Sequence, residues 1–197
     1  MLNIGLDLLE QVGDIAKRAG QEIMKVYETD FAVEAKADQS PVTEADKMAE
    51  ELILRSISMG ITDKYPIIGE EDFAAGNAPA IGDDPFWLVD PLDGTKEFVN
   101  RNGEFTVNIA LIDGGRPAMG VIHAPVGNRT YWGAATGVFT QTGDEEERII
   151  ACREAPTDGM IAMVSRSHRG PDIDGFLSEY NIASETSAGS SFKFCLI

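Results

Sequence analysis

Residues 87–98 read WLVDPLDGTKEF, in which a short apolar run ends on two aspartates that lie three positions apart. The run over residues 86–89 is typical of a buried strand, and it leads directly into Asp90. Asp90 and Asp93 flank a predicted turn that leaves this strand. Pro91 stiffens the turn because its ring fixes φ and removes one backbone N–H. The stretch therefore predicts two carboxylates at the end of a strand.

The turn continues into a helix that is predicted to begin at Thr95. Gly94 lets the backbone approach a ligand closely, and a strand–turn–helix junction presents free N–H groups that bind phosphate oxygens. Carboxylates beside these amides would hold Mg²⁺ against the same phosphate, because Mg²⁺ takes oxygen ligands and keeps positions open for water and substrate. The same residues also fit an Asx-type turn that caps the helix, with both acids in water. The residue types alone leave these two interpretations open.

Two further groups of polar residues lie at the ends of predicted elements. Glu70 follows the apolar run over residues 66–68, and it could supply another metal ligand. Two such metals can activate a water and neutralise a leaving oxygen. Thr43 and Asp46 open a helix predicted over residues 43–57, where Thr-x-x-Asp forms a capping box, a purely structural device. The alternative for Asp46 is a functional acid that faces the metals and orients a hydroxyl group.

The remaining pattern predicts an α+β first part, residues 1–155, and a second part, residues 156–197, that begins an α/β unit. An amphipathic helix is predicted over residues 6–27. A β-meander with a hairpin turn at Asp113-Gly114-Gly115 is predicted over residues 105–112, 118–123, 130–134 and 138–142. After Pro156 the pattern predicts a strand over 160–165, a helix over 172–180, a strand over 182–186 and an apolar helix opened by Ser190.

The 197 residues carry a net charge of −17, with 16 basic and 33 acidic side chains. This charge argues against binding to a nucleic-acid polymer or to an anionic lipid surface. A phosphorylated substrate would need bound cations to reverse the local field. No apolar run approaches the roughly 20 residues of a transmembrane segment, and the N-terminal residues lack the pattern of a secretory signal. The two cysteines form no CxxC pattern, so they are expected to be reduced thiols in a cytoplasmic protein.

Three ordered motifs resemble those of the inositol monophosphatase superfamily of lithium-sensitive, Mg²⁺-dependent phosphatases. They are SPVTEAD at residues 40–46, IGEE at residues 68–71 and the stretch at residues 87–98. The resemblance extends over essentially the whole chain. It implies an α/β protein with a layered α-β-α-β-α sugar-phosphatase fold, in which the metals lie between an α+β half and an α/β half. It also implies Mg²⁺ as the cofactor, with two or three ions, and inhibition by Li⁺ and Ca²⁺.

Shorter markers resemble the 3′(2′),5′-bisphosphate nucleotidase branch of this superfamily. They are KEF at residues 96–98, SRSH at residues 165–168 and GSSFKFC at residues 189–195. The branch implies hydrolysis of the 3′-phosphate of adenosine 3′,5′-bisphosphate to AMP and phosphate, in sulfur metabolism. The alternative substrate is inositol monophosphate or a sugar phosphate. A homodimer and peripheral attachment to the cytoplasmic face of the inner membrane are further expectations.

The resemblance also implies roles for individual residues. Metal ions would be bound by the carbonyl of Leu92 and by the side chains of Glu70, Asp90 and Asp93. Phosphate would be held by the backbone N–H groups of Gly94 and Thr95. Asp46 would pair with the Thr95 hydroxyl and help to activate the attacking water, together with Glu70, whereas Thr43 is expected to be a cap.

The nucleotide contacts that the resemblance implies are His168, Ser190 and Lys193. Lys193 has the clearest physical role, because a cation can face a second phosphate. His168 fits a loop histidine at a strand end equally well. His123, on a strand of the meander, is expected to be a packed or surface side chain.

The chain departs from the superfamily pattern near its C-terminal end, because it stops at Ile197 inside the helix opened by Ser190. A Trp-Asp-Thr motif, which supplies another metal ligand in the superfamily, does not occur in the sequence. The second domain is therefore expected to be incomplete and the phosphatase activity strongly reduced. An inactive metal-binding remnant is the alternative of another class. Apolar surface is expected to be exposed at residues 160–164 and 192–197.

Overall fold

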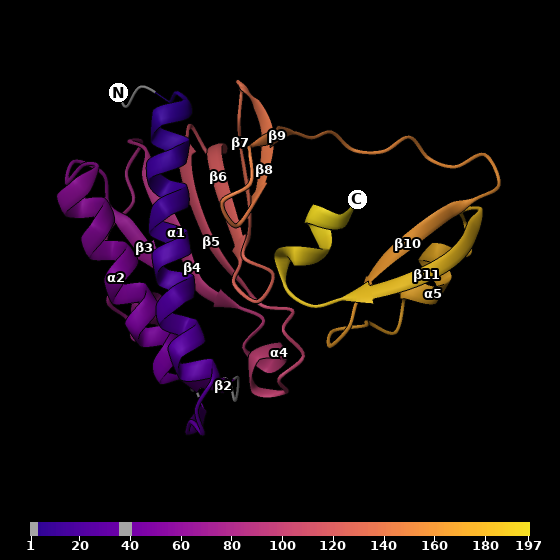
Figure 1. Ribbon diagram of the computed structural model, residues 1–197, viewed down its shortest axis with the longest axis horizontal. Helices are drawn as coiled ribbons and strands as arrows, with labels where there is room; N and C mark the ends of the chain where they lie inside the picture. Colours follow the sequence, from indigo (N-terminus) through magenta and orange to yellow (C-terminus); the bar gives the residue numbers. More distant parts are fainter. Residues whose placement is uncertain (1–3, 36–40) are drawn as a thin grey trace.

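The computed structural model describes residues 4–35 and 41–197 of the chain (Figure 1). Two long helices cover one face of a seven-stranded mixed sheet, and a smaller unit with two parallel strands lies on the other side. The mixed α/β class predicted from the sequence is confirmed. The division at residue 155 stays a prediction, although the chain has no helix or strand between residues 150 and 159. Ser40 of the SPVTEAD motif lies outside the described residues.

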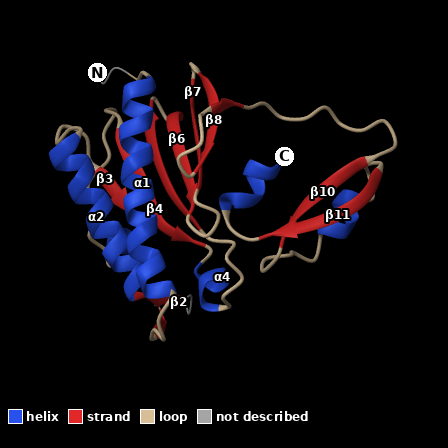
Figure 2. Ribbon diagram, in the orientation of Figure 1, coloured by secondary structure: helices blue, strands red, loops and turns tan. Residues whose placement is uncertain are grey.

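Figure 2 shows which parts of the chain are helix and which are strand. Their bounds are α1 (Leu6–Tyr27), β1 (Val33–Ala35), β2 (Pro41–Thr43), α2 (Glu44–Gly60), β3 (Ile67–Gly69), α3 (Glu70–Ala74), β4 (Phe86–Asp93), α4 (Thr95–Val99), β5 (Thr106–Asp113), β6 (Arg116–Ala124), β7 (Arg129–Ala134), β8 (Gly137–Thr142), β9 (Arg148–Ile149), β10 (Met160–Ser165), α5 (Ile173–Leu177), β11 (Ile182–Ala188) and the 3₁₀-helix η1 (Ser191–Leu196).

The large sheet has the order β3-β4-β5-β6-β7-β8-β9. Strands β3 and β4 are parallel, and the following pairs are antiparallel. The four predicted meander strands correspond to β5 to β8, and a two-residue hairpin turn joins Asp113 to Arg116. Strand β9, which pairs with β8 at the edge of the sheet, is not predicted by the sequence.

The main core lies between the sheet and the helices α1 and α2, each of which buries its apolar side. At one end of this core, aromatic side chains surround Phe98 of α4. Its ring centroid lies 5.1 Å from that of Tyr27, 4.7 Å from that of Phe31 and 5.2 Å from that of Phe105. Because Phe98 is completely buried, this cluster holds the short helix α4 in place and with it Thr95 at the start of the helix.

Strand β4 differs from the prediction, because it continues through both aspartates and ends at Asp93. Between Asp90 and Asp93 the pairing with β5 shifts, so that three steps along β4 oppose the two steps from Asn108 to Thr106. Pro91 has no N–H to donate, and it lies in this irregular stretch. The predicted turn is therefore a bulge within the strand. It arises from the pairing with β5, which local sequence does not encode.

The C-terminal segment, residues 160–197, contains β10 and β11, which pair in parallel, with α5 between them in sequence. Helix α5 is shorter than the predicted range 172–180, and the helix after Ser190 is a 3₁₀-helix. Ile161, Phe194 and Ile197 are exposed, as predicted for this segment, whereas Val164 is buried. In residues 4–35 and 41–197, no helix combines the length and the apolar character that a membrane crossing needs.

His123 on β6 is buried, and its Nδ1 lies 2.9 Å from the Thr130 hydroxyl oxygen. Burial, with the nearby Lys17 charge, lowers the pKa of His123 from 6.5 to about 4. Between about pH 4 and pH 6.5 the histidine is therefore protonated in the unfolded chain but neutral in the folded chain. The free energy of unfolding consequently falls as the pH is lowered through this range. Lowering the pH from about 7.5 to about 5 should reduce the free energy of unfolding by about 2 kcal/mol through His123 alone.

The measurement is urea unfolding of the wild type and of His123→Gln at both pH values. The pH-dependent loss of stability should be about 2 kcal/mol smaller in the variant than in the wild type. His168→Gln, a change of the exposed histidine, serves as the control and should follow the wild type. Equal losses in the wild type and in His123→Gln would contradict the assignment.

Candidate active site

A pocket of about 320 Å³ lies where β4 and α4 meet the C-terminal segment. Its lining includes every site residue predicted from the sequence except Asp46, which is buried behind Thr95. The side chains come from separate parts of the chain, and the residues are Glu70, Asp90, Leu92, Asp93, Gly94, Thr95, Lys96, Glu97, Ser165, His168, Ser190 and Lys193. The structure therefore brings the predicted residues together, while their individual roles stay predictions.

The bulge in β4 and the residue after it direct this strand end into the pocket. Leu92 N–H donates to Asp90 Oδ1 at 3.2 Å, which orients the carboxyl group. Gly94 has a φ of 90°, in the left-handed region that disfavours other residues. A Cβ at Gly94 would also lie 3.0 Å from the Ser190 Cβ and 3.1 Å from the Glu104 carbonyl oxygen. Glycine is therefore required here for the backbone conformation and for the close approach of the C-terminal segment.

The carboxyl groups of Glu70 and Asp93 lie close enough to Asp90 to disfavour its ionisation. Burial raises the pKa of Asp90 to about 9, and the charges of Glu70 and Asp93 and a hydrogen bond shared with Glu70 add to this effect. No three His, Cys, Asp or Glu side chains of residues 4–35 and 41–197 already form a complete ion-binding group. A divalent cation bound here would offset the negative charges of Glu70 and Asp93 and favour the ionised form of Asp90.

The donor atoms at this place fit a hard cation such as Mg²⁺. Glu70, Asp90 and Asp93 would offer carboxylate oxygens, and Leu92 would offer its carbonyl oxygen. Asp93 Oδ2 accepts hydrogen bonds from Ser191 N–H and from Asn108 Nδ2, so its orientation is fixed from two sides. The Leu92 carbonyl accepts the Thr95 hydroxyl at 3.2 Å and keeps a second lone pair. An oxygen-only set of this kind suits Mg²⁺ better than a softer metal.

Asp46 makes the capping contacts that its sequence pattern predicts and also contacts Thr95, while its catalytic role stays a prediction. Its Oδ2 accepts the Thr43 N–H and the Thr43 hydroxyl, both at 2.7 Å, which is the capping arrangement at the start of α2. Its Oδ1 accepts the Thr95 hydroxyl at 3.3 Å. Asp46 is only 1% exposed. The capping hydrogen bonds to Oδ2 therefore fix the carboxyl group so that Oδ1 faces the Thr95 hydroxyl.

Glu50 is a buried acid that the sequence analysis did not single out. It is 4% exposed and accepts the Glu71 N–H at 2.9 Å and the Asp72 N–H at 2.8 Å. Burial raises the pKa of Glu50, while these two backbone hydrogen bonds oppose the rise. Glu50 therefore holds the start of α3, where Glu70 enters the pocket. Its position one helical turn after Asp46 was the available signal.

The same pocket is also lined by basic side chains. Lys96 Nζ lies 3.0 Å from His168 Nε2, so α4 and the loop after β10 meet at this point. Lys193 Nζ donates to the Ser190 carbonyl oxygen and lies 4.9 Å from the centre of the Phe194 ring. Ser190 Oγ accepts the Phe192 N–H and so caps η1. Lys96 is an addition to the predicted set, and its adjacency to Thr95 was the signal in the sequence.

Comparison with known proteins adds an independent observation. Residues 7–197 match the inositol monophosphatase family. The chain is 43% identical over 192 residues to the 3′(2′),5′-bisphosphate nucleotidase CysQ of Escherichia coli, an alignment that covers 96% of this chain and 76% of the relative. It is 37% identical over 200 residues to the CysQ of Buchnera aphidicola, with 99% and 73% covered. The crystal structure of CysQ from Bacteroides thetaiotaomicron superposes with a TM-score of 0.76 at 35% identity, covering 97% of this chain and 76% of that one.

Proposed function

Because the chain belongs to the inositol monophosphatase family, we propose that it is a metal-dependent phosphomonoesterase that removes the 3′-phosphate from adenosine 3′,5′-bisphosphate. The products are AMP and phosphate. The observation that carries the proposal is that one pocket gathers the acids Glu70, Asp90 and Asp93 together with the basic side chains of Lys96 and Lys193. The bacterial relatives compared above are named as 3′(2′),5′-bisphosphate nucleotidases.

Two phosphate groups suit a pocket of this polarity better than one. The scissile phosphate would lie beside Glu70, Asp90 and Asp93. There the backbone N–H groups of Gly94 and Thr95 would hold it, and a cation would offset the carboxylates. The second phosphate would contact Lys193, and His168 and Ser190 would lie near the nucleotide. A substrate with a single phosphate would leave the lysines without an anionic partner.

Hydrolysis needs a group that takes a proton from the attacking water, and the Asp46–Thr95 pair is placed for this task. Thr95 donates its hydroxyl proton toward Asp46 Oδ1. As the water attacks, it gives a proton to the Thr95 oxygen, and the original Thr95 hydroxyl proton moves to the buried Asp46 carboxylate. The new P–O bond forms as the bond to the 3′ oxygen breaks, and that oxygen leaves as an alkoxide, which takes a proton from a solvent water to become the 3′ hydroxyl of AMP.

A divalent cation, when bound, would lower the pKa of water and stabilise the charge on the transferred phosphoryl group. Family membership supports a divalent metal, and Mg²⁺ is our proposal on the basis of the oxygen donors. The use of two or three ions and inhibition by Li⁺ and Ca²⁺ belong to the same proposal. So do the homodimer, the role in sulfur metabolism and the cytoplasmic location at the inner membrane.

A substrate panel with Mg²⁺ tests the proposal directly. We expect kcat/KM for adenosine 3′,5′-bisphosphate to exceed that for inositol 1-phosphate by about 10²-fold or more, because two charge-assisted hydrogen bonds to the second phosphate are worth about 3 kcal/mol. Fructose 1,6-bisphosphate controls for a second phosphate without an adenosine group. Equal kcat/KM values for the nucleotide and inositol phosphate would contradict the substrate assignment, and metal binding without turnover of any substrate would support the inactive remnant.

A further inference from the structure

The segment from Gly189 to Lys193 brings two residues of the pocket, Ser190 and Lys193, from a distant part of the chain. Acidic side chains of residues 93–104 hold it in place. Gly189 N–H donates to Glu104 Oε2 at 2.7 Å, and Ser191 N–H donates to Asp93 Oδ2. The two amides on either side of Ser190 are therefore both anchored to carboxylates of the other part of the molecule.

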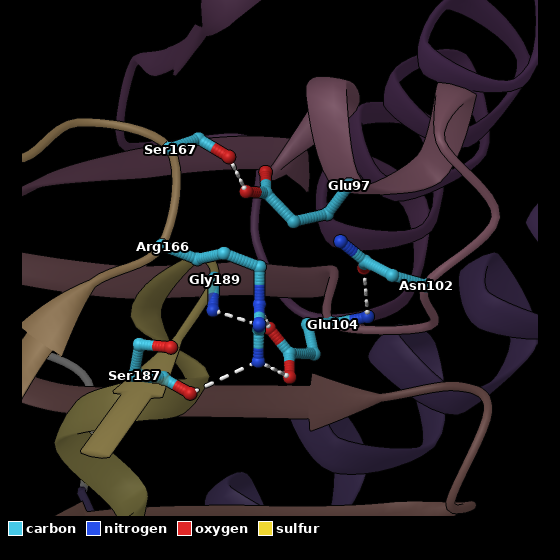
Figure 3. A network of polar contacts seen from close by, with 7 residues as sticks. All are labelled: Glu97, Asn102, Glu104, Arg166, Ser167, Ser187 and Gly189. Carbon is cyan, nitrogen blue, oxygen red and sulfur yellow. Dashed lines mark hydrogen bonds and ion pairs between the residues drawn. The ribbon is translucent and has the colours of Figure 1, made fainter.

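Arg166 completes this arrangement from the loop that follows β10 (Figure 3). Its Nε donates to Glu104 Oε2 at 2.7 Å and its Nη2 to Glu104 Oε1 at 2.6 Å, a two-pronged ion pair. Nη2 also donates to the Ser187 carbonyl oxygen at 3.0 Å. Hydrogen bonding from Arg166 lowers the pKa of Glu104. Glu104 thus stays ionised while it binds both the guanidinium group and the Gly189 amide.

Two further contacts orient this group, for which we use the name clasp (Glu104, Arg166, Ser187 and Gly189). Glu104 N–H donates to Asn102 Oδ1 at 3.0 Å. Ser167, next to Arg166, donates its hydroxyl to Glu97 Oε1, and Glu97 is only 2% exposed. Figure 3 shows the two acids pointing from one part of the molecule toward the arginine and serine of the other.

The backbone at Gly189 and Ser190 is shaped by these neighbours. A Cβ at Gly189 would lie 2.4 Å from Glu97 Cγ and 2.9 Å from the Glu104 carbonyl oxygen, so the contact admits only glycine without a shift. Ser190 has a φ of 49°, in the region that residues other than glycine rarely adopt. Because this conformation is intrinsically unfavourable, contacts from outside the segment must hold it.

We propose that Arg166 and Glu104 are positioning residues that hold Ser190 and Lys193 against the second phosphate of the substrate. This inference rests on the proposed bisphosphate specificity. Neither residue borders the pocket, so both act through the segment that they hold. Glu70 and Asp90 come from α3 and β4, and Asp93 keeps the hydrogen bond from Asn108 when the segment moves. We therefore expect the acids of the pocket to keep their places when the clasp is broken. Loss of the clasp should therefore weaken binding of the bisphosphate more than it slows the chemical step.

The first test compares Arg166→Ala with Arg169→Ala, a matched control. Arg169 is similarly exposed, but it pairs with Glu185 at 2.7 Å and with Asp174, both within the C-terminal segment. In Arg166→Ala, KM for adenosine 3′,5′-bisphosphate should rise about tenfold, the equivalent of one charge-assisted hydrogen bond. Its kcat should stay within about twofold, as should KM for p-nitrophenyl phosphate, which lacks a second phosphate. Arg169→Ala should leave all three values at those of the wild type.

Glu104→Gln provides a gentler variant, because it keeps an acceptor for the Gly189 amide and removes the charge that binds Arg166. It should raise the bisphosphate KM in the same direction, and Arg166→Lys should raise it less than Arg166→Ala, since lysine keeps the charge but loses the planar fork. A rise in KM for both substrates alike, or a fall in kcat with KM unchanged, would overturn the positioning role. So would an unchanged bisphosphate KM in both Arg166→Ala and Glu104→Gln.

Hydrogen exchange of the amides at residues 189–193 gives a readout that needs no substrate. Exchange there should be about tenfold faster in Arg166→Ala than in the wild type or Arg169→Ala, since the opening free energy falls by about 1.4 kcal/mol. If the wild type does not turn over the bisphosphate, the proposed function fails, and faster exchange at these amides would still support the anchoring part of the inference. Unchanged exchange would overturn the inference whatever the substrate is.

Discussion

Asp93→Asn is expected to lower kcat with saturating Mg²⁺ by about 10³-fold, the largest effect of any single change in the pocket. A bound cation is worth several kcal/mol of transition-state stabilisation, and each 1.36 kcal/mol corresponds to a factor of ten. The asparagine keeps the size of the side chain and an oxygen that can accept the Ser191 N–H. It removes the negative charge, which is the property that a cation needs. The measurement is phosphate release at several Mg²⁺ concentrations.

The same change should not destabilise the metal-free protein. In the absence of a cation, the charges of Asp93 and Glu70 both disfavour ionisation of Asp90, so the loss of one charge relieves repulsion. We therefore expect the metal-free Tm of Asp93→Asn to equal or exceed that of the wild type. Asp144→Asn, the same chemical change at an exposed turn, is the control and should retain wild-type kcat. A retained kcat with an unchanged Mg²⁺ requirement would show that Asp93 is not a metal ligand.

The regular elements could be predicted because their signal is local. The apolar spacing of α1 and of β10 predicts both bounds as they are observed, and the glycines after Asp113 predict the hairpin between β5 and β6. Each of these features depends on periodicity or turn chemistry within a few residues. The ends of short helices are weaker, since α5 is held by few local contacts and is shorter than its pattern predicts.

The residues of the candidate site could be predicted from the sequence, but the long-range contacts that bring them together could not. The bulge between Asp90 and Asp93 depends on the pairing with Asn108 and Thr106. The role of Glu50 depends on backbone groups 21 and 22 residues away, and the Glu104–Arg166 pair spans 62 residues. A single sequence carries no direct signal for such contacts. They are also the contacts that convert acids at separate strand ends into one pocket.

Asp46 shows why a capping pattern and a catalytic pattern could not be separated by sequence. Both need an acid at the third position of a helix, and in this structure one oxygen of the carboxylate accepts the capping N–H while the other accepts the Thr95 hydroxyl. The two threonines that bond Asp46 provide a way to separate the tasks, because each contacts a different oxygen.

Thr43→Val should therefore affect folding more than turnover. It removes the hydroxyl that donates to Asp46 Oδ2 but leaves the Thr43 N–H bond to the same oxygen. Loss of a capping hydrogen bond costs about 1 kcal/mol of unfolding free energy, which lowers Tm by about 2–4 °C in a protein of this size. The value of kcat should stay within about threefold of the wild type, because the oxygen that faces Thr95 keeps its place.

Thr95→Val should show the opposite result, with kcat lowered by about 10²-fold or more, as for loss of a general base. The one proton of the Thr95 hydroxyl is within reach of both Asp46 Oδ1 and the Leu92 carbonyl oxygen, and valine has a similar shape but no proton to pass. Its methyl group can occupy the same partly buried space, so Tm should change by less than about 3 °C. Parallel measurements of kcat and Tm on both variants decide the matter. Equal losses of kcat in Thr43→Val and Thr95→Val would mean that Asp46 acts only through the position of α2, and the proton-transfer role of Thr95 would then be wrong.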